Sequence, residues 1–274
     1  MVIAQDPWCP PVIRWAGSKR KLLPILISAS PPVFRRYFEP FVGSGCLFFA
    51  LKPKRAVLGD INEELVSALQ ALRQHPRLLH RRAAAFGLNR RKYYELRDHP
   101  KSIDGITGEA ARFIALNRYC FNGLYRANRS GKFNVPFGTR TGALPAESIF
   151  YRAAIALRNA KIVQGDFAET VRTARRGDYV YLDPPYVYSG RRDRGEYGPN
   201  TFSVDDVERL FVTMRRLTER GAYVLLSFIE CDEVLRRARG WTVRRVPVQR
   251  QISAFAQYRI RVNEVLISNY EFQL

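Results

Sequence analysis

Four consecutive residues, Asp183-Pro184-Pro185-Tyr186, combine the groups needed to hold a planar base by its exocyclic amine. The Asp183 carboxylate and the Pro184 carbonyl can accept the two hydrogens of an amine, and the Tyr186 ring can stack on the base. Neither proline has an amide hydrogen and both restrict φ, so the turn is stiff. A strand that simply ends in an acidic turn is the plainer interpretation, and other parts of the chain must decide between the two.

The range 178–182, directly before this turn, is apolar and β-prone and predicts a buried strand. The two prolines end the strand, because neither can donate to a sheet ladder. Open α/β sheets bind ligands at the carboxyl ends of their strands. The turn is therefore expected at a ligand site.

A glycine-bearing turn follows another predicted strand early in the chain. The range 33–39 predicts a strand and the range 46–51 an apolar helix. In the turn between them, 40–45, Gly43 and Gly45 let the backbone approach a ligand closely. Strand, glycine turn and helix begin a nucleotide-binding α/β unit, although the spacing is not the dinucleotide pattern G-x-G-x-x-G.

Carboxylates also end the next two predicted strands. The range 55–59 leads to Asp60, where a carboxylate can accept both hydroxyls of a ribose. The range 161–165 leads to Asp166-Phe167, an acid and an aromatic ring that can take an adenine by its amine and its face. This arrangement favours an adenosine-containing cofactor, and by itself it does not separate NAD from S-adenosylmethionine.

A small-residue turn, 16–18, precedes a helix predicted over 21–27. Backbone N–H groups at such a helix start can hold a carboxylate, and Lys19 adds positive charge. Trp15 can pack beside a cofactor. A buried tryptophan and a solvated basic loop explain the same residues, so they support a cofactor site only together with the strand ends.

The composition is that of a basic globular protein. Of 274 residues, 45 are Lys or Arg and 25 are Asp or Glu, and the net charge of +20 suits a polyanionic partner such as nucleic acid. Arginine far outnumbers lysine, as GC-rich coding also produces. Four cysteines without C-x-x-C spacing predict reduced intracellular thiols, neither a disulfide framework nor a zinc site. No apolar run is long enough to span a bilayer, and the first residues lack a signal-peptide pattern.

From about residue 75 the sequence changes character. The ranges 77–86, 91–97 and 108–119 predict helices rich in Arg and Ala. The segment 117–138 then alternates aromatic, Asn or Gly and basic residues, with a hairpin turn predicted at 129–132. Such a mixture suits contacts with phosphates and base edges, whereas a solvated basic loop would leave many aromatic rings without a partner.

The last third of the chain returns to alternating helix and strand. The range 204–220 predicts a helix with an acidic start, and 222–228 predicts a strand. The ranges 241–248 and 263–269 predict a closing antiparallel pair. Earlier in the chain, Asn62 is placed to cap the helix that follows Asp60.

From about residue 13 to residue 270, the chain resembles the Dam-like, D12-class DNA adenine-N6 methyltransferases. The matching stretches, in the family's order, are Arg14-Trp15-Ala16-Gly17-Ser18-Lys19, Glu39-Pro40-Phe41-Val42-Gly43-Ser44-Gly45, Asp60-Ile61-Asn62, Gly165-Asp166-Phe167 and Asp183-Pro184-Pro185-Tyr186. The segment 117–138 resembles the family's DNA-recognition hairpin. Ser18 stands where the family commonly has a second glycine, and Arg140 where Dam itself has an aromatic residue, which bears on sequence specificity.

The resemblance implies an α/β fold, a Rossmann-like seven-stranded S-adenosylmethionine-dependent methyltransferase sheet with a reversed final strand. It implies a catalytic domain formed by 1–64 and 159–274. A helical DNA-recognition domain, 65–158, would be inserted after the second strand and carry a β-hairpin.

The resemblance also implies roles for individual residues. Catalysis would fall to Asp183, Pro184, Pro185 and Tyr186. The cofactor S-adenosylmethionine would contact Trp15, Ala16, Gly17, Lys19, Glu39, Pro40, Phe41, Gly43, Gly45, Asp60, Ile61, Asp166, Phe167 and Asp183. DNA would contact Arg14, Arg118, Tyr119, Asn122, Leu124, Arg126, Asn128, Lys132, Pro136 and Arg140. No metal is expected.

The chemistry implied is methyl transfer to the N6 amine of an adenine that has been flipped out of double-stranded DNA. We expect Arg126 to read the guanine before the adenine in a GATC or GATC-like site, because arginine pairs bidentately with guanine. Leu124 and Pro136 would press on thymine methyls. No covalent enzyme intermediate is needed. A cytosine-C5 methyltransferase would need a nucleophilic cysteine, typically in the order Pro-Cys. Here the order is Cys9-Pro10 and the pair lies outside the predicted sheet, which disfavours that class.

Several alternatives stay open on the sequence. An RNA or cytosine-N4 methyltransferase would share the cofactor half, an NAD-dependent enzyme would share the strands and acids, and a DNA-binding module could keep the motifs without activity. We expect a monomer in a bacterial, archaeal or phage-encoded cytoplasmic setting, without a membrane partner. A restriction endonuclease of the same system is a further candidate partner.

Overall fold

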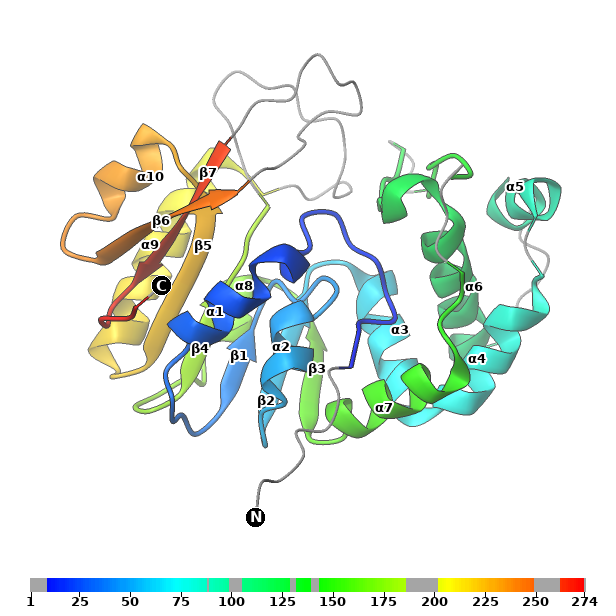
Figure 1. The fold of residues 1–274 in the computed structure, drawn as a ribbon, viewed down its shortest axis with the longest axis horizontal. Helices are drawn as coiled ribbons and strands as arrows, with labels where there is room; N and C mark the ends of the chain where they lie inside the picture. Colours follow the sequence, from blue (N-terminus) through cyan, green and yellow to red (C-terminus); the bar gives the residue numbers. More distant parts are fainter. Residues whose placement is uncertain are drawn as a thin grey trace.

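A computed structural model describes residues 9–87, 89–98, 105–128, 132–138, 143–185, 202–248 and 262–273. In the described part, seven strands form one sheet in the order β3-β2-β1-β4-β5-β7-β6 (Figure 1). The strands are β1 (Tyr37–Glu39), β2 (Ala56–Asp60), β3 (Ala160–Gln164), β4 (Tyr179–Leu182), β5 (Tyr223–Ile229), β6 (Thr242–Val248) and β7 (Val262–Ser268).

Strands β1 to β5 pair with one another in parallel, whereas β7 runs antiparallel to both β5 and β6. The prediction of a seven-stranded α/β sheet with a reversed final strand is therefore confirmed. We call the edge at which β1 to β4 end the carboxyl edge, and the opposite edge the amino edge.

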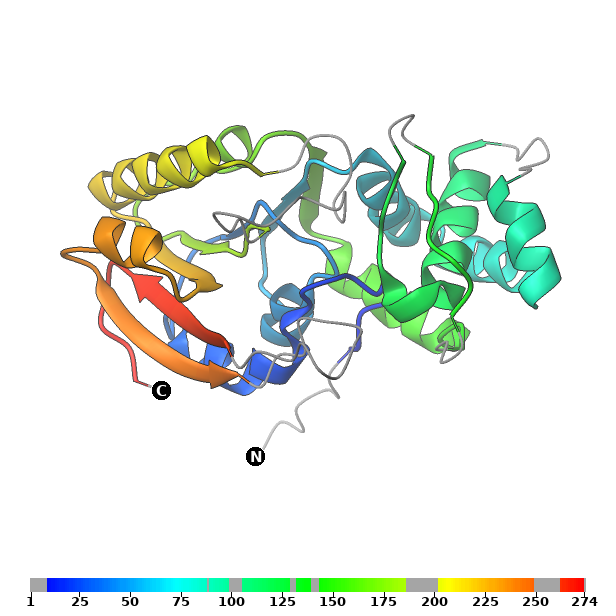
Figure 2. The same ribbon diagram turned by 90° about the horizontal axis from the view of Figure 1, so that it is seen from above.

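Helices cover both faces of the sheet (Figure 2). They are α1 (Leu23–Ala29), α2 (Cys46–Leu51), α3 (Glu63–Gln74), α4 (Pro76–Ala85), α5 (Arg90–Asp98), α6 (Gly105–Tyr119), α7 (Glu147–Leu157), α8 (Phe167–Thr170), α9 (Val204–Glu219) and α10 (Asp232–Arg237). Short 3-10 turns are η1 (Lys19–Leu22) and η2 (Phe121–Gly123).

The alternation of side chains along β4 explains how this central strand is held. Tyr179 and Tyr181 belong to the core shared with α1, α2, α3, α6 and α7, while Val180 and Leu182 belong to the core shared with α8, α9 and α10. All four side chains are buried. A strand buried on both faces and paired on both sides holds the residue that follows it, Asp183, in a fixed place.

Some elements differ from their predicted bounds. Strand β1 is shorter than the predicted 33–39, because two prolines precede Val33 and leave it 79% exposed, outside the ladder. Helices α7 and α10 were not predicted. The cap predicted at Asn62 is confirmed, because its side chain accepts a hydrogen bond from the Leu65 amide. At the acidic start of α9, Ser203 forms a capping box with Asp206.

Helices α3 to α7 lie between β2 and β3 in the chain and pack mainly on one another. The segment after α6 has two arms joined by isolated antiparallel bridges, Cys120 with Phe137 and Ala127 with Phe133. Most of the predicted hairpin turn, 129–131, lies outside the described residues. No helix in the described part of the chain is long and apolar enough to cross a membrane.

Candidate active site

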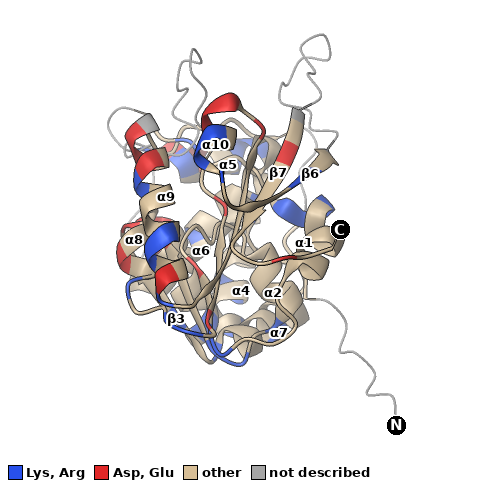
Figure 3. Cartoon of the chain, turned by 90° about the vertical axis from the view of Figure 1, so that its left-hand side faces the viewer, with Lys and Arg blue, Asp and Glu red and all other residues tan. Residues whose placement is uncertain are grey.

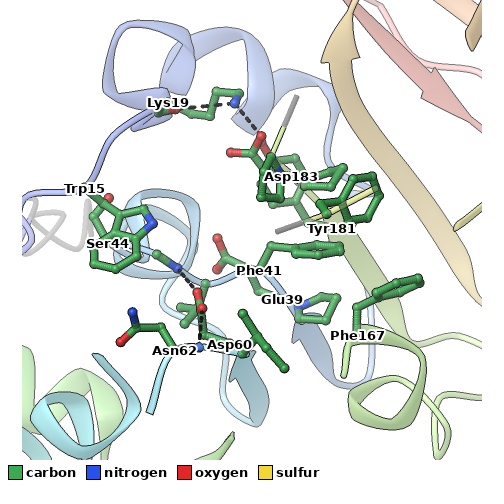
Figure 4. Close-up of a pocket in the computed structure, with 18 of the residues that line it drawn as sticks. Trp15, Lys19, Glu39, Phe41, Ser44, Asp60, Asn62, Phe167, Tyr181 and Asp183 are labelled. Carbon is green, nitrogen blue, oxygen red and sulfur yellow. Dashed lines mark hydrogen bonds and ion pairs between the residues drawn. The ribbon is translucent and has the colours of Figure 1, made fainter. Parts of the chain in front are cut away.

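A cavity of about 360 Å³ opens at the carboxyl edge of the sheet (Figure 4). It brings together all the predicted cofactor residues except Gly45, which begins α2 and packs toward Phe49. Pro184 and Pro185 line the cavity as well, and Tyr186 lies outside the described residues. The lining residues that the sequence did not single out include Tyr181, Phe202, Asp206 and Arg209.

The charged residues that line the cavity are mostly acidic, although the chain as a whole is basic. Five carboxylate residues face the cavity, Glu39, Asp60, Asp166, Asp183 and Asp206, against two basic residues, Lys19 and Arg209. In a chain of net charge +20, such a lining favours a ligand that carries a positive centre. Among the described residues, no group of three or more His, Cys, Asp or Glu is arranged to hold a metal ion.

The carboxylate of Asp183 is held on one side only. Its Oδ1 pairs with Nζ of Lys19, a side chain just 4% exposed, and accepts a hydrogen bond from the Ser227 hydroxyl at 3.1 Å. Tyr181 and Ser227 are in turn joined hydroxyl to hydroxyl at 2.9 Å. Oδ2 has no partner among the described residues, so it is the free acceptor of the group.

Asp60 ties the glycine turn to the end of β2. Its Oδ2 accepts a hydrogen bond from the Gly43 amide at 3.1 Å, and its Oδ1 accepts one from the Asn62 amide at 3.0 Å. Burial raises the pKa of Asp60 to about 6, against the lowering effect of these amides. Each carboxylate oxygen keeps a second lone pair, so Asp60 can still accept hydroxyl groups from a ligand.

The glycine turn passes close beneath an aromatic ring. A Cβ added at Gly43, where φ is +47°, would lie 2.6 Å from Cδ1 of Trp15. The Trp15 ring stacks on Tyr125 at 5.6 Å between centroids. Gly43 is therefore required both by its backbone conformation and by the approach of Trp15.

Aromatic rings close the other end of the cavity. Phe41 stacks on Phe167 with centroids 5.3 Å apart, and Phe202 meets Phe41 edge to face. Asp166 caps α8 through the Ala168 amide and pairs with Arg209 at 2.9 Å. Both Asp166 oxygens therefore already have donors, and an adenine amine would have to share them.

Glu39 is buried at the cavity floor, where it accepts a hydrogen bond from the Tyr37 hydroxyl at 3.0 Å. Burial raises the pKa of Glu39 well above its ordinary value, and the nearby Asp183 and Asp60 add to the effect. A carboxyl group in this setting resists ionisation.

The predicted DNA-binding residues lie on and beside the two arms after α6. Arg126 donates through Nε to Oδ1 of Asn134 at 2.8 Å, across the arms, and its Nη1 has no partner in the described part of the chain. Arg118 instead donates to the carbonyls of Val12 and Ala143, and burial lowers its pKa to about 10.

The remaining residues predicted to contact DNA fall into an exposed group and a partly buried group. Asn122, Asn128, Lys132 and Pro136 are exposed, whereas Arg14, Tyr119 and Leu124 are partly buried. The backbone of Arg14 exchanges two hydrogen bonds with the Asn117 side chain, which joins the first loop to α6. Arg140 lies outside the described residues.

Sequence reasoning missed Ser227 and Arg209, which contact the predicted carboxylates Asp183 and Asp166. Ser227 is a polar residue in the apolar run of β5, and that mismatch was a usable signal. Arg209 lies in the second turn of α9 and gives no sequence signal, because only the fold brings it to Asp166.

A seven-stranded sheet with an acid-lined, aromatic cavity at its carboxyl edge is typical of α/β proteins that bind a nucleotide-containing cofactor. The sequence profile of the D12 class N6 adenine-specific DNA methyltransferases matches residues 15–241. The chain belongs to this family, and it is an adenine-specific DNA methyltransferase. The family implies S-adenosylmethionine as the methyl donor.

Individual relatives match over nearly the whole chain. A protein named Type II methyltransferase M1.LlaDCHI from Lactococcus lactis subsp. cremoris is 32% identical over 95% of both chains. One named DNA adenine methylase from Vibrio cholerae is 32% identical over 93% of this chain and 94% of its own. The DNA adenine methylase of Escherichia coli K12 is 31% identical over 93% of each chain.

Proposed function

We propose that Asp183 and the Pro184 carbonyl hold the N6 amine of the flipped adenine during methyl transfer. The observation that carries this assignment is the one-sided holding of Asp183, whose Oδ1 is fixed by Lys19 and Ser227 while Oδ2 is left as an acceptor. Tyr186 stacks on the base in this proposal. The adenine then lies beside the cavity, where the methyl donor belongs.

The cavity suits S-adenosylmethionine, which supplies a methyl group on a positively charged sulfur that leaves as a neutral thioether. The excess of carboxylates in the lining matches the charge of that sulfur. We assign the ribose to Asp60 and the adenine ring of the cofactor to the Phe41 and Phe167 faces. Trp15 and the Gly43 turn border the methionine part.

The residues at Asp183 act on the nitrogen, whose lone pair is delocalised into the adenine ring. Accepting both amine hydrogens favours rehybridisation toward a tetrahedral nitrogen, and the carboxylate stabilises the positive charge that develops there. In-line alignment with the methyl group supplies most of the remaining acceleration. The Lys19 and Ser227 contacts hold the acceptor in place before the base arrives.

We assign DNA recognition to residues 65–158, with the two arms after α6 entering the major groove. Arg126 is held across the arms by Asn134, which leaves the Nη1 end of the guanidinium to pair with guanine O6 and N7. We propose a GATC or GATC-like site, read by a monomer. Arg118, Asn128 and Lys132 position the DNA backbone in this assignment.

The test is a methylation profile. DNA from adenine-methylation-free cells that express the protein should carry N6-methyladenine at one short sequence with a guanine before the adenine. Purified protein should transfer label from tritiated S-adenosylmethionine to a duplex with that sequence, and hardly to RNA. A profile without GATC would contradict the site, and methylation of cytosine would contradict the assignment of the amine.

A further inference from the structure

The amino edge of the sheet is strongly basic, although it plays no part in the site described above. We define the amino-edge loops as the stretches that lead into β1 to β5, namely 31–36, 52–55, 158–159, 172–178 and 220–222. Together they hold ten lysines and arginines and a single acid, Asp178. Over the whole chain the ratio is 45 to 25, so the shortage of acids is specific to this edge.

Backbone hydrogen bonds join the amino-edge loops into one row. Asn159 accepts from the Ala56 amide, Arg55 from the Tyr37 amide, Gly177 from the Arg35 amide and Gly221 from the Gly177 amide. The loops therefore follow the order of the strands. Because neighbouring strands lie about 4.8 Å apart, five loops span roughly 20 Å.

Part of the charge on this row is available to a partner, although Arg172 pairs with Glu169 at 3.2 Å. Asp178 is fully buried and is neutralised by Arg36 at 2.6 Å. Arg35, Arg55, Arg158 and Arg175 are exposed, and none pairs with a carboxylate in the part of the chain that the structure describes. Figure 3 shows Lys and Arg gathered along these lower loops, below the label of β3.

We propose that the amino edge binds the phosphate backbone of a second DNA segment while the first occupies the active site. Strands β2, β3 and β5, five to seven residues long, separate the two edges by roughly 15–23 Å, so one straight duplex cannot lie along both. A row of about 20 Å faces roughly six base pairs of one backbone at 3.4 Å each. DNA is favoured over other polyanions because the bound substrate keeps neighbouring DNA at high local concentration.

Such a site would read no sequence, because the amino-edge loops offer cations to phosphates and lie on no element that could enter a groove. Its binding would depend steeply on salt through the release of counterions. The consequence for the enzyme is transfer between DNA segments without complete dissociation.

The experiment is a two-duplex capture. Protein is bound to an immobilised short duplex that it methylates, with that duplex in excess so that active sites are filled. A fluorescent duplex lacking the site is then added. The wild-type protein should capture it at low salt, and a triple variant, Arg35→Gln, Arg55→Gln and Arg175→Gln, should capture at least fivefold less, with a salt slope shallower by roughly 2.7.

The matched control removes three exposed arginines elsewhere, Arg236→Gln, Arg239→Gln and Arg244→Gln, and should keep most of the capture. Replacing the three edge arginines by lysine should restore it. Methyl transfer to the short duplex should be unchanged in the triple variant of the amino edge (the edge variant). Unchanged activity also shows that this variant is correctly folded. Equal loss in both triple variants, undiminished capture by the edge variant, or preferential capture of RNA over DNA would overturn the proposal.

Discussion

The two edges of the sheet differ sharply in charge, although they are built from the same strands. At the carboxyl edge, five carboxylates and two basic residues line a cavity rimmed by aromatic rings. At the amino edge, ten lysines and arginines accompany a single buried acid. Net charge therefore says little about where a ligand of either sign is bound, and the position of a loop relative to the strands says much more.

The edges also differ in how their charges are fixed. Asp183, Asp60 and Asp166 are each held by specific donors at the ends of strands. Four exposed arginines of the amino-edge loops, Arg35, Arg55, Arg158 and Arg175, pair with no carboxylate among the described residues. Chemistry on a reacting atom needs fixed groups, whereas attraction of a phosphate backbone tolerates mobile ones.

The largest expected effect concerns the fixed carboxylate. Asp183→Asn should lower the single-turnover rate of methyl transfer by roughly 10³-fold, the order found when one preorganised group is removed from a transition state. The amide would turn donors toward an amine that needs acceptors. Rapid-quench measurement with tritiated cofactor reports the rate of this step.

Asp183→Ala should fail equally in the chemical step. It also removes the side-chain acceptor of the buried Lys19, whereas asparagine keeps an amide oxygen there, so the alanine variant loses more stability. Its thermal unfolding should therefore occur at lower temperature than that of Asp183→Asn. DNA and cofactor affinities should remain near those of the wild-type protein in the asparagine variant. Near-normal turnover in both variants would remove Asp183 from the catalytic role.

Much of the carboxyl edge was predictable from sequence. Each strand that ends in an acid or a glycine turn has an apolar run before it, and the parallel sheet brings those ends to one side. What could not be predicted is how the acids are partnered. Ser227 and Lys19 lie 44 and 164 residues from Asp183 in the chain, and only the fold brings them together.

The arms after α6 were predictable as a segment and less so in detail. Their mixed aromatic and basic character was visible, whereas the inward bonding of Arg118 to two carbonyls was not. An arginine that bonds to the protein's own carbonyls and one that faces solvent give the same letter in a sequence. The amino edge was equally invisible, because its arginines come from five separate loops.

Arg126, on the arms after α6, should behave differently from the arginines of the amino edge. Arg126→Ala should cost roughly 1–3 kcal/mol of discrimination at the guanine before the adenine, with a smaller effect on nonspecific affinity. Lys132 is a phosphate contact in our assignment, so Lys132→Ala should weaken binding to DNA of all sequences alike. Methylation profiles of cells expressing each variant separate the two, and an unaltered preference in Arg126→Ala would assign that residue to the backbone.

Asp60 should give the cofactor affinity a pH dependence. Its pKa of about 6 means that protonation below that pH removes an acceptor from the ribose site, so affinity should fall as pH drops from 8 to 5. Asp60→Asn should weaken binding at pH 8 by roughly 1–3 kcal/mol and flatten the profile. Calorimetry without DNA measures both, and equal profiles for the two proteins would make Asp60 structural.

The ionisation of Asp60 affects the free energy of unfolding in the direction opposite to its effect on cofactor affinity. Because its pKa in the folded protein is raised, the group contributes most to stability below pH 4, and that contribution is lost as pH rises through about 6. Asp60→Asn should therefore show a smaller loss of unfolding free energy between pH 4 and pH 6 than the wild-type protein. Urea titrations at the two pH values compare them.

The smallest expected effect tests whether Asp183 needs both of its hydrogen-bond donors, Lys19 and Ser227. Ser227→Ala removes the hydroxyl that donates to Oδ1 and leaves Lys19 in place. One lost hydrogen bond of this kind is worth roughly 0.5–1.5 kcal/mol, so kcat should fall by roughly 2- to 12-fold. The KM values for DNA and cofactor should stay unchanged, because Ser227 contacts the carboxylate and not the ligands.

Two variants distinguish a positioning role for Ser227 from a merely structural one. Ser227→Thr keeps a hydroxyl and should restore most of kcat. Tyr181→Phe removes the partner behind Ser227 but leaves its donation to Asp183 intact, so the loss should be smaller than in Ser227→Ala. If Tyr181→Phe costs more than Ser227→Ala, or if the alanine variant raises KM in proportion to its loss of rate, then packing of β4 on β5 explains the effect and Lys19 alone holds the carboxylate.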